Sequence, residues 1–201
     1  MDAESVDRAR RYALGRLERD IPDGLFYHSL AHTVSDVVPA AEFLAEREGV
    51  TGTALLQLRT AAWFHDVGFV ELRVGHEAVG ARLAAEVLPG FGYSPSDIMT
   101  IQAIIMATAI PQSAATPLER IMADADLDVL GRDDFLSRNT NLRRELAFYG
   151  QEFSDAQWFS GQLKFVGTHR YFTGSARALR DQTKARNVET LKEVLANATT
   201  A

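Results

Sequence analysis

The amino-acid sequence predicts an all-α fold of about eight helices. Three observations carry this prediction. Apolar residues recur at three- and four-residue spacing through most of the chain, and signals for helix starts and stops separate these stretches. The chain also contains no alternating apolar-polar stretch long enough to indicate a β-strand. A length of 201 residues fits a single domain.

Four helices are predicted in the first half of the chain. They cover residues 5–19, 30–47, 53–65 and 76–88. The first two of these stretches have apolar residues on one face, as expected for helices at the surface of a bundle. Residues 53–65 are more thoroughly apolar, and we therefore expect a central helix there.

Four more helices are predicted in the second half, three of them from their N-terminal signals. In each case a serine or threonine hydroxyl can cap the first turn, and a proline, acidic residue or glutamine completes the signal. These signals are Ser94-Pro95-Ser96-Asp97, Thr116-Pro117-Leu118-Glu119, and Ser154 with Gln157. The last helix is expected over residues 175–197. Stop signals occur at Gly49, at residues 89–92 and at Gly131.

The composition excludes several classes of function. The chain contains no cysteine, which rules out disulfides, a thiolate nucleophile, thiolate-bound zinc and iron–sulfur clusters. Any metal must therefore be held by histidine, carboxylates, carbonyl groups or water. The formal net charge of −6 is opposite to that of a typical nucleic-acid-binding protein.

No targeting segment or membrane span is predicted. The first residues are acidic and lack the basic start and apolar core of a signal peptide. No stretch reaches the roughly 20 apolar residues that cross a bilayer. We therefore expect a cytoplasmic protein.

Two short stretches place ionisable side chains where apolar residues are expected. His28 and His32 are four residues apart, so they share one face if the segment is helical. His65 and Asp66 end the apolar stretch at 53–65, and adjacent residues on a regular helix point about 100° apart. Both can reach one ion only if the helix ends there, and Val67-Gly68 supplies such a break.

Three acidic residues, Asp124, Asp126 and Asp128, form a third unusual feature within an apolar stretch. On a helix Asp124 and Asp128 share a face while Asp126 lies on the other, so the three need not have the same role. Their mutual repulsion requires a cation or an arginine nearby. One histidine, one His-Asp pair and one later aspartate can together form a mixed nitrogen and oxygen site for a divalent metal.

The ordered set of His32, His65-Asp66 and Asp124 or Asp126 resembles the H…HD…D signature of HD-domain metal-dependent phosphohydrolases. The resemblance covers about residues 25–131, and residues 169–173 echo it more weakly. It implies an HD-domain helical bundle that forms one domain over residues 1–201. In this arrangement the signature core is 25–131, and C-terminal helices over 133–197 pack on it.

The resemblance also implies a ligand set of His32, His65, Asp66 and one late aspartate, with Asp66 part of the catalytic machinery. Asp126 is preferred over Asp124 because Ala125-Asp126-Leu127 better matches the alanine, aspartate and apolar residue of the family. The implied cofactor is a divalent ion (Mn, Mg, Fe, Co, Ni or Zn), whose identity stays open.

The segment Tyr27-His28 with His32 is similar to one in cyclic-nucleotide phosphodiesterases of this superfamily. There the first histidine is the general acid and the second is a metal ligand. Carried over, the resemblance makes His28 the residue that protonates the leaving oxygen, and a histidine pKa near neutrality suits this task. A second-shell role for His28 stays open.

The sequence departs from the dinuclear members of the superfamily, which use two further histidines. His76 fits the first of these positions, but Thr108 stands near the second, so a complete six-ligand di-iron site is not expected. His76 is instead a candidate for contact with substrate or with a second ion. Arg132 and Arg170 are candidate phosphate clamps, since the guanidinium fork matches phosphate geometry.

The activity implied is hydrolysis of a phosphate monoester or phosphodiester, nucleotides included, by water that the metal activates. Two alternatives stay open: an HD-type di-iron oxygenase, and a non-catalytic module that binds a metal or a nucleotide. The expected partner is a small phosphorylated substrate, with neither nucleic acid nor membrane. The oligomeric state is open, and a homodimer is one option.

Overall fold

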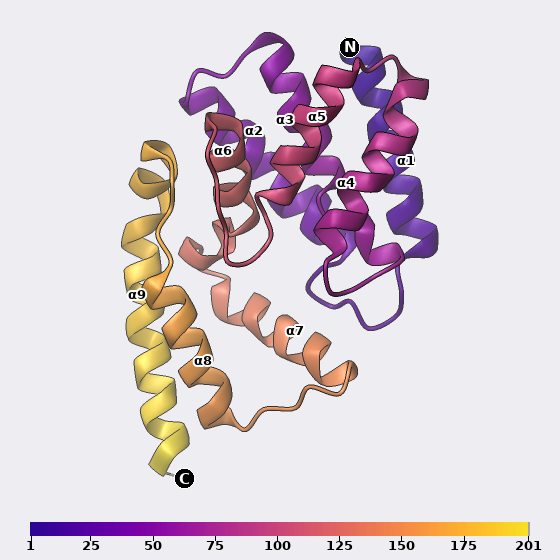
Figure 1. The fold of residues 1–201 in the computed structure, drawn as a ribbon. Helices are drawn as coiled ribbons and strands as arrows, with labels where there is room; N and C mark the ends of the chain where they lie inside the picture. Colours follow the sequence, from indigo (N-terminus) through magenta and orange to yellow (C-terminus); the bar gives the residue numbers. More distant parts are fainter. Residues whose placement is uncertain (201) are drawn as a thin grey trace. The chain divides into compact units, whose positions relative to one another are not determined.

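The computed structural model describes residues 1–200 and confirms the all-α prediction (Figure 1). The described residues form nine α-helices, and no β-strand occurs among them. The helices are α1 (Ala3–Asp20), α2 (Val38–Arg47), α3 (Gly52–Phe64), α4 (His76–Val87), α5 (Pro95–Met106), α6 (Pro117–Asp126), α7 (Phe135–Phe148), α8 (Asp155–Thr168) and α9 (Gly174–Thr200). A π-helical segment, η1 (His32–Val37), and three 3₁₀ segments, η2 (Val67–Val70), η3 (Leu88–Phe91) and η4 (Asp128–Gly131), complete them. Within residues 1–200, no helix has the length and apolar character needed to cross a membrane.

The chain forms two compact units. The first contains Met1–Asp23 and His28–Asp126, and the second contains Gly24–Tyr27 and the residues from Leu127 onward. The sequence-based expectation of one domain over residues 1–201 stays a prediction. The first unit holds α1 to α6, and the second holds α7 to α9.

Helix α3 is the central helix of the first unit, as its apolar sequence predicted. It packs against α1, α2, α5 and α6. Its side chains Leu58, Ala61, Ala62 and Phe64 are at most 1% exposed. Burial of this helix places its C-terminal end, which carries His65 and Asp66, inside the unit.

The three predicted N-terminal signals are confirmed. The backbone N–H of Asp97 donates to the Ser94 hydroxyl, and that of Gln157 donates to the Ser154 hydroxyl, each at 3.2 Å. The corresponding bond from Glu119 to the Thr116 hydroxyl of α6 measures 3.3 Å. Each start satisfies backbone N–H groups that have no partner within the helix.

In the second unit, helices α8 and α9 pack side by side and η4 lies against α9 (Figure 1). The apolar core of this unit includes Val129, Leu130, Phe135, Val166 and Leu191. Polar contacts also hold η4 on α9. Arg180 donates two hydrogen bonds to the buried Asp128 carboxylate, at 2.6 and 2.8 Å. Gly131 permits this packing because a Cβ there would lie 2.5 Å from the Arg180 Cβ.

Candidate metal centre

The His65-Asp66 pair lies where α3 ends, as the sequence predicted. The last helical residue is Phe64, and the Asp66 backbone leaves the helix with φ −102° and ψ 0° before η2 begins. This turn brings the two side chains together, so that His65 Nε2 lies 3.2 Å from Asp66 Oδ2. Both residues are buried, at 0% and 2% exposure.

His32 reaches the same place from the π-helical segment η1. Its Nε2 atom lies 3.3 Å from Asp126 Oδ1 and 3.8 Å from Asp66 Oδ2. The regular helix predicted over 30–47 is therefore wrong in its first part. Pro39 provides the physical reason, because a proline within an α-helix clashes with the carbonyl four residues before it. The wider π turn, in which the Val38 N–H bonds to the Thr33 carbonyl, avoids this clash.

Asp126 is the last residue of α6 and faces the two buried imidazoles. Its Oδ1 atom lies 3.3 Å from His32 Nε2 and 3.7 Å from His65 Nε2. Asp124 is fully buried within α6. The expectation that Asp124 and Asp128 share a helix face is wrong, because α6 ends at Asp126 and Asp128 lies in η4. Asp128 pairs with Arg180. The expectation that a cation or an arginine lies near the three aspartates is therefore met by an arginine at Asp128.

His76, the first residue of α4, also approaches Asp66. Its Nε2 atom lies 3.4 Å from Asp66 Oδ1 and 3.6 Å from Glu77 Oε1. Two glycines allow α4 to come this close. A Cβ on Gly68 would lie 1.9 Å from the His76 carbonyl oxygen, and a Cβ on Gly80 would lie 2.9 Å from the Phe64 carbonyl oxygen.

In His65 and His76, a contact between Nδ1 and a backbone carbonyl fixes the direction in which Nε2 points. His65 Nδ1 lies 2.8 Å from the Ala62 carbonyl oxygen, and His76 Nδ1 lies 3.1 Å from the Arg73 carbonyl oxygen. Because a carbonyl oxygen can only accept, each Nδ1 carries the proton. In neutral His65, the Nε2 lone pair then faces the Asp66 carboxylate, and two acceptors meet at 3.2 Å.

Two buried atoms of this cluster lack a hydrogen-bond partner, namely His65 Nε2 and Asp66 Oδ2. Unsatisfied buried polar atoms are costly, and those at a functional site often mark the place of an ion. One ligand atom from each of His32, His65 and Asp66 lies within 4.8 Å of the others. The donor set and its burial therefore fit a divalent cation.

The charges of the cluster favour the charged forms of both His32 and Asp66. Burial alone would lower the pKa of His32, but Asp126, Asp36 and Asp66 together raise it to about 10. Burial raises the pKa of Asp66, but the imidazoles of His65 and His76 outweigh this effect and lower it well below its usual value. The carboxylates around His32 thus favour a positive charge at its position.

His28 lies beside the cluster in a bend that precedes η1, and not on a shared helix face with His32 as the four-residue spacing suggested. Its ring is partly exposed, and its centroid lies 6.0 Å from those of both His32 and His76. Phe69 stacks on His28 at 4.6 Å and on His76 at 3.8 Å. Sequence reasoning missed Phe69, since an aromatic residue next to an apolar helix normally indicates core packing.

Sequence reasoning also missed Asp36, which is 8% exposed. One of its carboxylate oxygens lies 3.7 Å from His32 Nδ1. The signal that could have revealed it is its spacing, four residues after a proposed ligand.

The other predicted residues have local partners. Arg132 belongs to the second unit and pairs with Asp134, with its Nε 2.9 Å from Oδ1 and its Nη2 2.6 Å from Oδ2. Arg170, also in the second unit, is exposed and donates to the carbonyls of Gly167 and His169. The Thr108 hydroxyl, in the first unit, donates to the Ile105 carbonyl at 2.8 Å.

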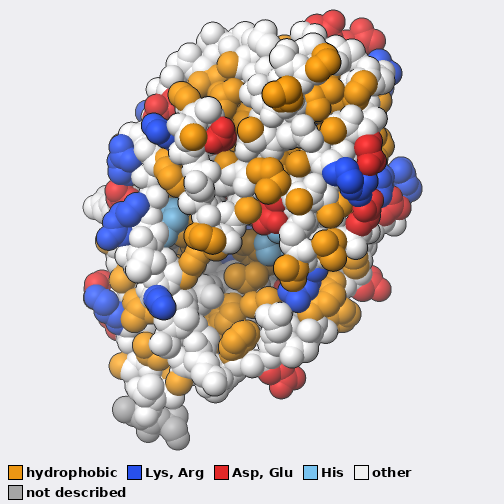
Figure 2. All heavy atoms as spheres, viewed as in Figure 1, with side chains coloured by type: hydrophobic (Ala, Val, Ile, Leu, Met, Phe, Trp, Pro, Cys, Tyr) orange, Lys and Arg blue, Asp and Glu red, His pale blue; other side chains and the backbone are white. Residues whose placement is uncertain are grey.

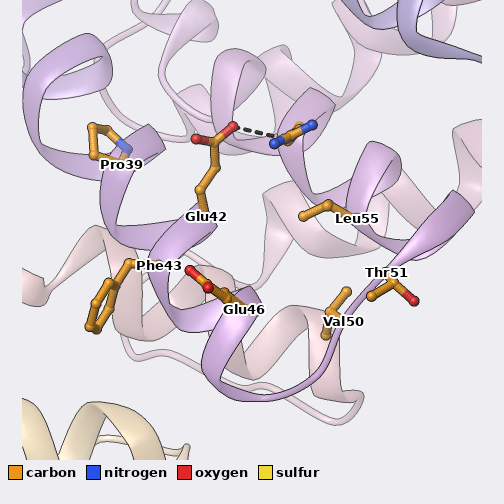
Figure 3. A pocket seen from close by; sticks show the side chains of 8 residues that line it. Pro39, Glu42, Phe43, Glu46, Val50, Thr51 and Leu55 are labelled. Atoms are coloured by element: carbon orange, nitrogen blue, oxygen red, sulfur yellow. Dashed lines mark ion pairs between the residues drawn. The ribbon is translucent and has the colours of Figure 1, made fainter.

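A depression of about 560 Å³ also lies in the first unit, on α2 and α3 (Figure 3). The Glu42 carboxylate pairs there with Arg59 at 2.8 Å, beside the apolar side chains of Phe43 and Leu55. None of the predicted site residues lines it. On the face drawn in Figure 2, histidine side chains expose only small areas.

Comparisons with known proteins agree with this architecture. No protein-family model and no curated protein matches the sequence. A solved structure does match: a predicted HD superfamily hydrolase from an uncultured Thermotogales bacterium, with a TM-score of 0.62 and 21% sequence identity. The match covers 93% of this chain and 91% of the other. The fold is therefore that of an HD-domain helical bundle, as the signature implied.

Proposed function

We propose that this chain, which has the fold of that HD superfamily protein, is a metal-dependent phosphohydrolase. Its substrate class is a phosphate monoester or phosphodiester, nucleotides included. The observation that carries the proposal is the convergence of buried imidazole and carboxylate groups around two atoms without partners, His65 Nε2 and Asp66 Oδ2. The structural neighbour, a predicted HD superfamily hydrolase, supports the reaction class.

The residues that would hold the ion are His32, His65, Asp66 and Asp126. Imidazole and carboxylate ligands suit borderline to hard divalent metals, and the absence of cysteine excludes thiolate sites. We assign Asp126 rather than Asp124 because its oxygen faces both buried imidazoles. A divalent cation in such a site lowers the pKa of water and polarises a phosphoryl oxygen.

The protein residues around the site have separable tasks. Because His65 Nδ1 is bonded to the Ala62 carbonyl, its Nε2 atom can offer a lone pair to the ion. Asp66 has Oδ2 beside His65 and Oδ1 beside His76. His28 is partly exposed and is packed on Phe69, so its imidazole can hold the proton that a leaving oxygen requires.

The proposal is tested by elemental analysis of the purified protein, followed by a phosphatase and phosphodiesterase screen with Mn²⁺, Co²⁺, Ni²⁺ and Mg²⁺. We expect about one or two equivalents of bound metal and turnover of at least one ester class. Asp66→Ala should abolish metal binding and activity, whereas His28→Gln should retain metal and lose roughly 10²- to 10⁴-fold in kcat. A wild-type protein that binds no divalent metal, or Asp66→Ala with full activity, contradicts the proposal.

The assignment of the late aspartate has its own matched test. Asp126→Asn and Asp124→Asn each remove one charge without changing side-chain shape. We expect Asp126→Asn to lose metal and Asp124→Asn to retain it, as measured by metal content after dialysis. The opposite result would reassign the ligand to Asp124.

The contact of His76 with Asp66 favours a second ion, which keeps a dinuclear site among the measurable outcomes. Two irons per chain together with oxygen consumption would indicate the HD-type di-iron oxygenase instead. Against that reading, the Thr108 hydroxyl lies in the turn after α5 and donates to the Ile105 carbonyl. A stoichiometric metal site without turnover on any ester would indicate a binding module.

A further inference from the structure

We propose that Asp36 is a positioning residue of the candidate metal centre. In this role its carboxylate holds the His32 ring with Nε2 toward Asp66 and Asp126, and strengthens the binding of a divalent cation. The inference rests on the metal site of the proposed function and adds a residue that the H…HD…D signature does not contain.

The geometry places the His32 ring between carboxylates on its two edges. On the inner edge Nε2 lies 3.3 Å from Asp126 Oδ1, and on the outer edge Nδ1 lies 3.7 Å from Asp36 Oδ2. A separation of 3.7 Å is too long for a direct hydrogen bond, so the attraction is mainly electrostatic. His32 and Asp36 are 3% and 8% exposed, and this burial reduces screening of the attraction by water.

His32 differs in this respect from His65 and His76. The outer nitrogens of those two rings face the backbone carbonyls of Ala62 and Arg73. A carbonyl orients an imidazole but adds no net charge, whereas a carboxylate both orients the ring and makes its free nitrogen a stronger donor to a metal. Asp36 therefore gives His32 a ligand strength that the other two imidazoles lack.

The local backbone accounts for the contact. His32 and Asp36 both lie in η1, the π-helical segment in which the Val38 N–H bonds to the Thr33 carbonyl. π-Helical turns are uncommon and occur frequently at functional sites. Because the chain continues directly into α2, which the buried Ala41 and Leu44 hold in the core, the Asp36 carboxylate stays beside the ring.

The inference is tested by titrating the metal-free full-length protein with Mn²⁺ and with Zn²⁺ in a calorimeter. Asp36→Asn removes the charge and keeps the shape, so we expect 10- to 100-fold weaker binding, the usual effect of losing such a partner. Glu46→Gln is the matched control, since it removes one exposed charge from α2 without touching His32, and less than about a twofold change is expected. Asp36→Glu restores the charge and should recover part of the affinity. Unchanged affinity in Asp36→Asn overturns the inference.

A second measurement needs no variant and so does not depend on the folding of Asp36→Asn. In ¹⁵N-labelled wild-type protein loaded with Zn²⁺, two-bond proton–nitrogen spectra identify the protonated nitrogen of each imidazole. We expect His32 to carry its proton on Nδ1, beside Asp36. A proton on Nε2, with the metal on Nδ1, overturns the inference.

The two proposals fail in different ways. Metal binding without ester hydrolysis contradicts the phosphohydrolase, while the affinity difference between Asp36→Asn and Glu46→Gln still stands. Active wild-type protein with equal metal affinity in Asp36→Asn overturns only the role of Asp36.

Discussion

Substitution of Gly68 by alanine tests how His76 is brought to Asp66. A Cβ at this position would lie 1.9 Å from the His76 carbonyl oxygen, 2.7 Å from its carbonyl carbon and 2.8 Å from the Gly80 nitrogen. All three neighbours are backbone atoms, so no side-chain rotation can relieve the overlap. Restoring a separation of 3.0 Å requires the carbonyl to move by at least 3.0 − 1.9 = 1.1 Å.

Such a shift changes both stability and the site. Overpacking of a core by one methyl group costs typically 1–3 kcal/mol, and we expect about 3 kcal/mol because rigid backbone must move. For a chain of this length that loss lowers Tm by roughly 6–12 °C. The movement also withdraws the first residue of α4, so the 3.4 Å contact between His76 Nε2 and Asp66 Oδ1 should open.

The assay is differential scanning calorimetry of Gly68→Ala against Gly161→Ala. Gly161 lies within α8, and a Cβ there meets no atom within 4 Å. Its substitution should raise stability by up to about 1 kcal/mol, because alanine is the better helix former. A Gly68→Ala protein with a Tm within about 2 °C of the wild type would show that α4 does not need this close approach.

Three further predictions concern the second unit. Ser154→Ala removes the capping hydroxyl of α8 and should cost about 1 kcal/mol in urea unfolding, and an unchanged midpoint would contradict the capping role. Arg180→Met leaves the buried Asp128 carboxylate without its bidentate partner and should cost about 2–4 kcal/mol, whereas a loss under about 0.5 kcal/mol would mean that water replaces the arginine. Burial and the neighbouring Lys184 lower the pKa of His169 from 6.5 to about 4, so below pH 6.5 the unfolded chain binds a proton that the folded chain does not. The free energy of unfolding should therefore fall by roughly 1–2 kcal/mol more in the wild type than in His169→Gln between about pH 7 and pH 4.5, a figure reduced for solvent screening of a partly exposed ring, and equal slopes would refute this.

The parts of the fold that depend on local signals were predictable from the sequence. The starts of α5, α6 and α8 follow from their capping residues, and the central position of α3 follows from its apolar character. The end of α3 at Phe64 also has a local cause in Val67-Gly68. In each case the determining interaction lies within a few residues of the element that it defines.

The π-helical start of the 30–47 region was not predicted, although its cause is also local. Apolar periodicity reports which side chains are buried, but it does not distinguish an α turn from a π turn over six residues. Pro39 was the relevant signal, because its effect is felt at the carbonyl four residues earlier.

The placement of the arginines shows what residue type alone leaves undetermined. A guanidinium fork fits a phosphate, and it fits a carboxylate equally well. Arg132 is paired with Asp134, two residues away, and Arg170 is bonded to neighbouring carbonyls. The pattern of basic residues therefore predicted an anion-binding role without information on these competing local partners.

The three aspartates at positions 124, 126 and 128 acquire different surroundings because α6 ends between the second and the third. Helical residues two apart point to opposite sides, so Asp126 can face the imidazoles while Asp124, which is also buried, lies on another side of α6. Beyond the helix end, Asp128 follows the geometry of η4 and bonds to Arg180. Arg180 compensates the charge of Asp128. The carboxylates of Asp126 and Asp66 both lie close to the imidazoles of His32 and His65. Two carboxylates facing inner imidazole nitrogens are a stable arrangement only when a proton or a metal ion lies between them.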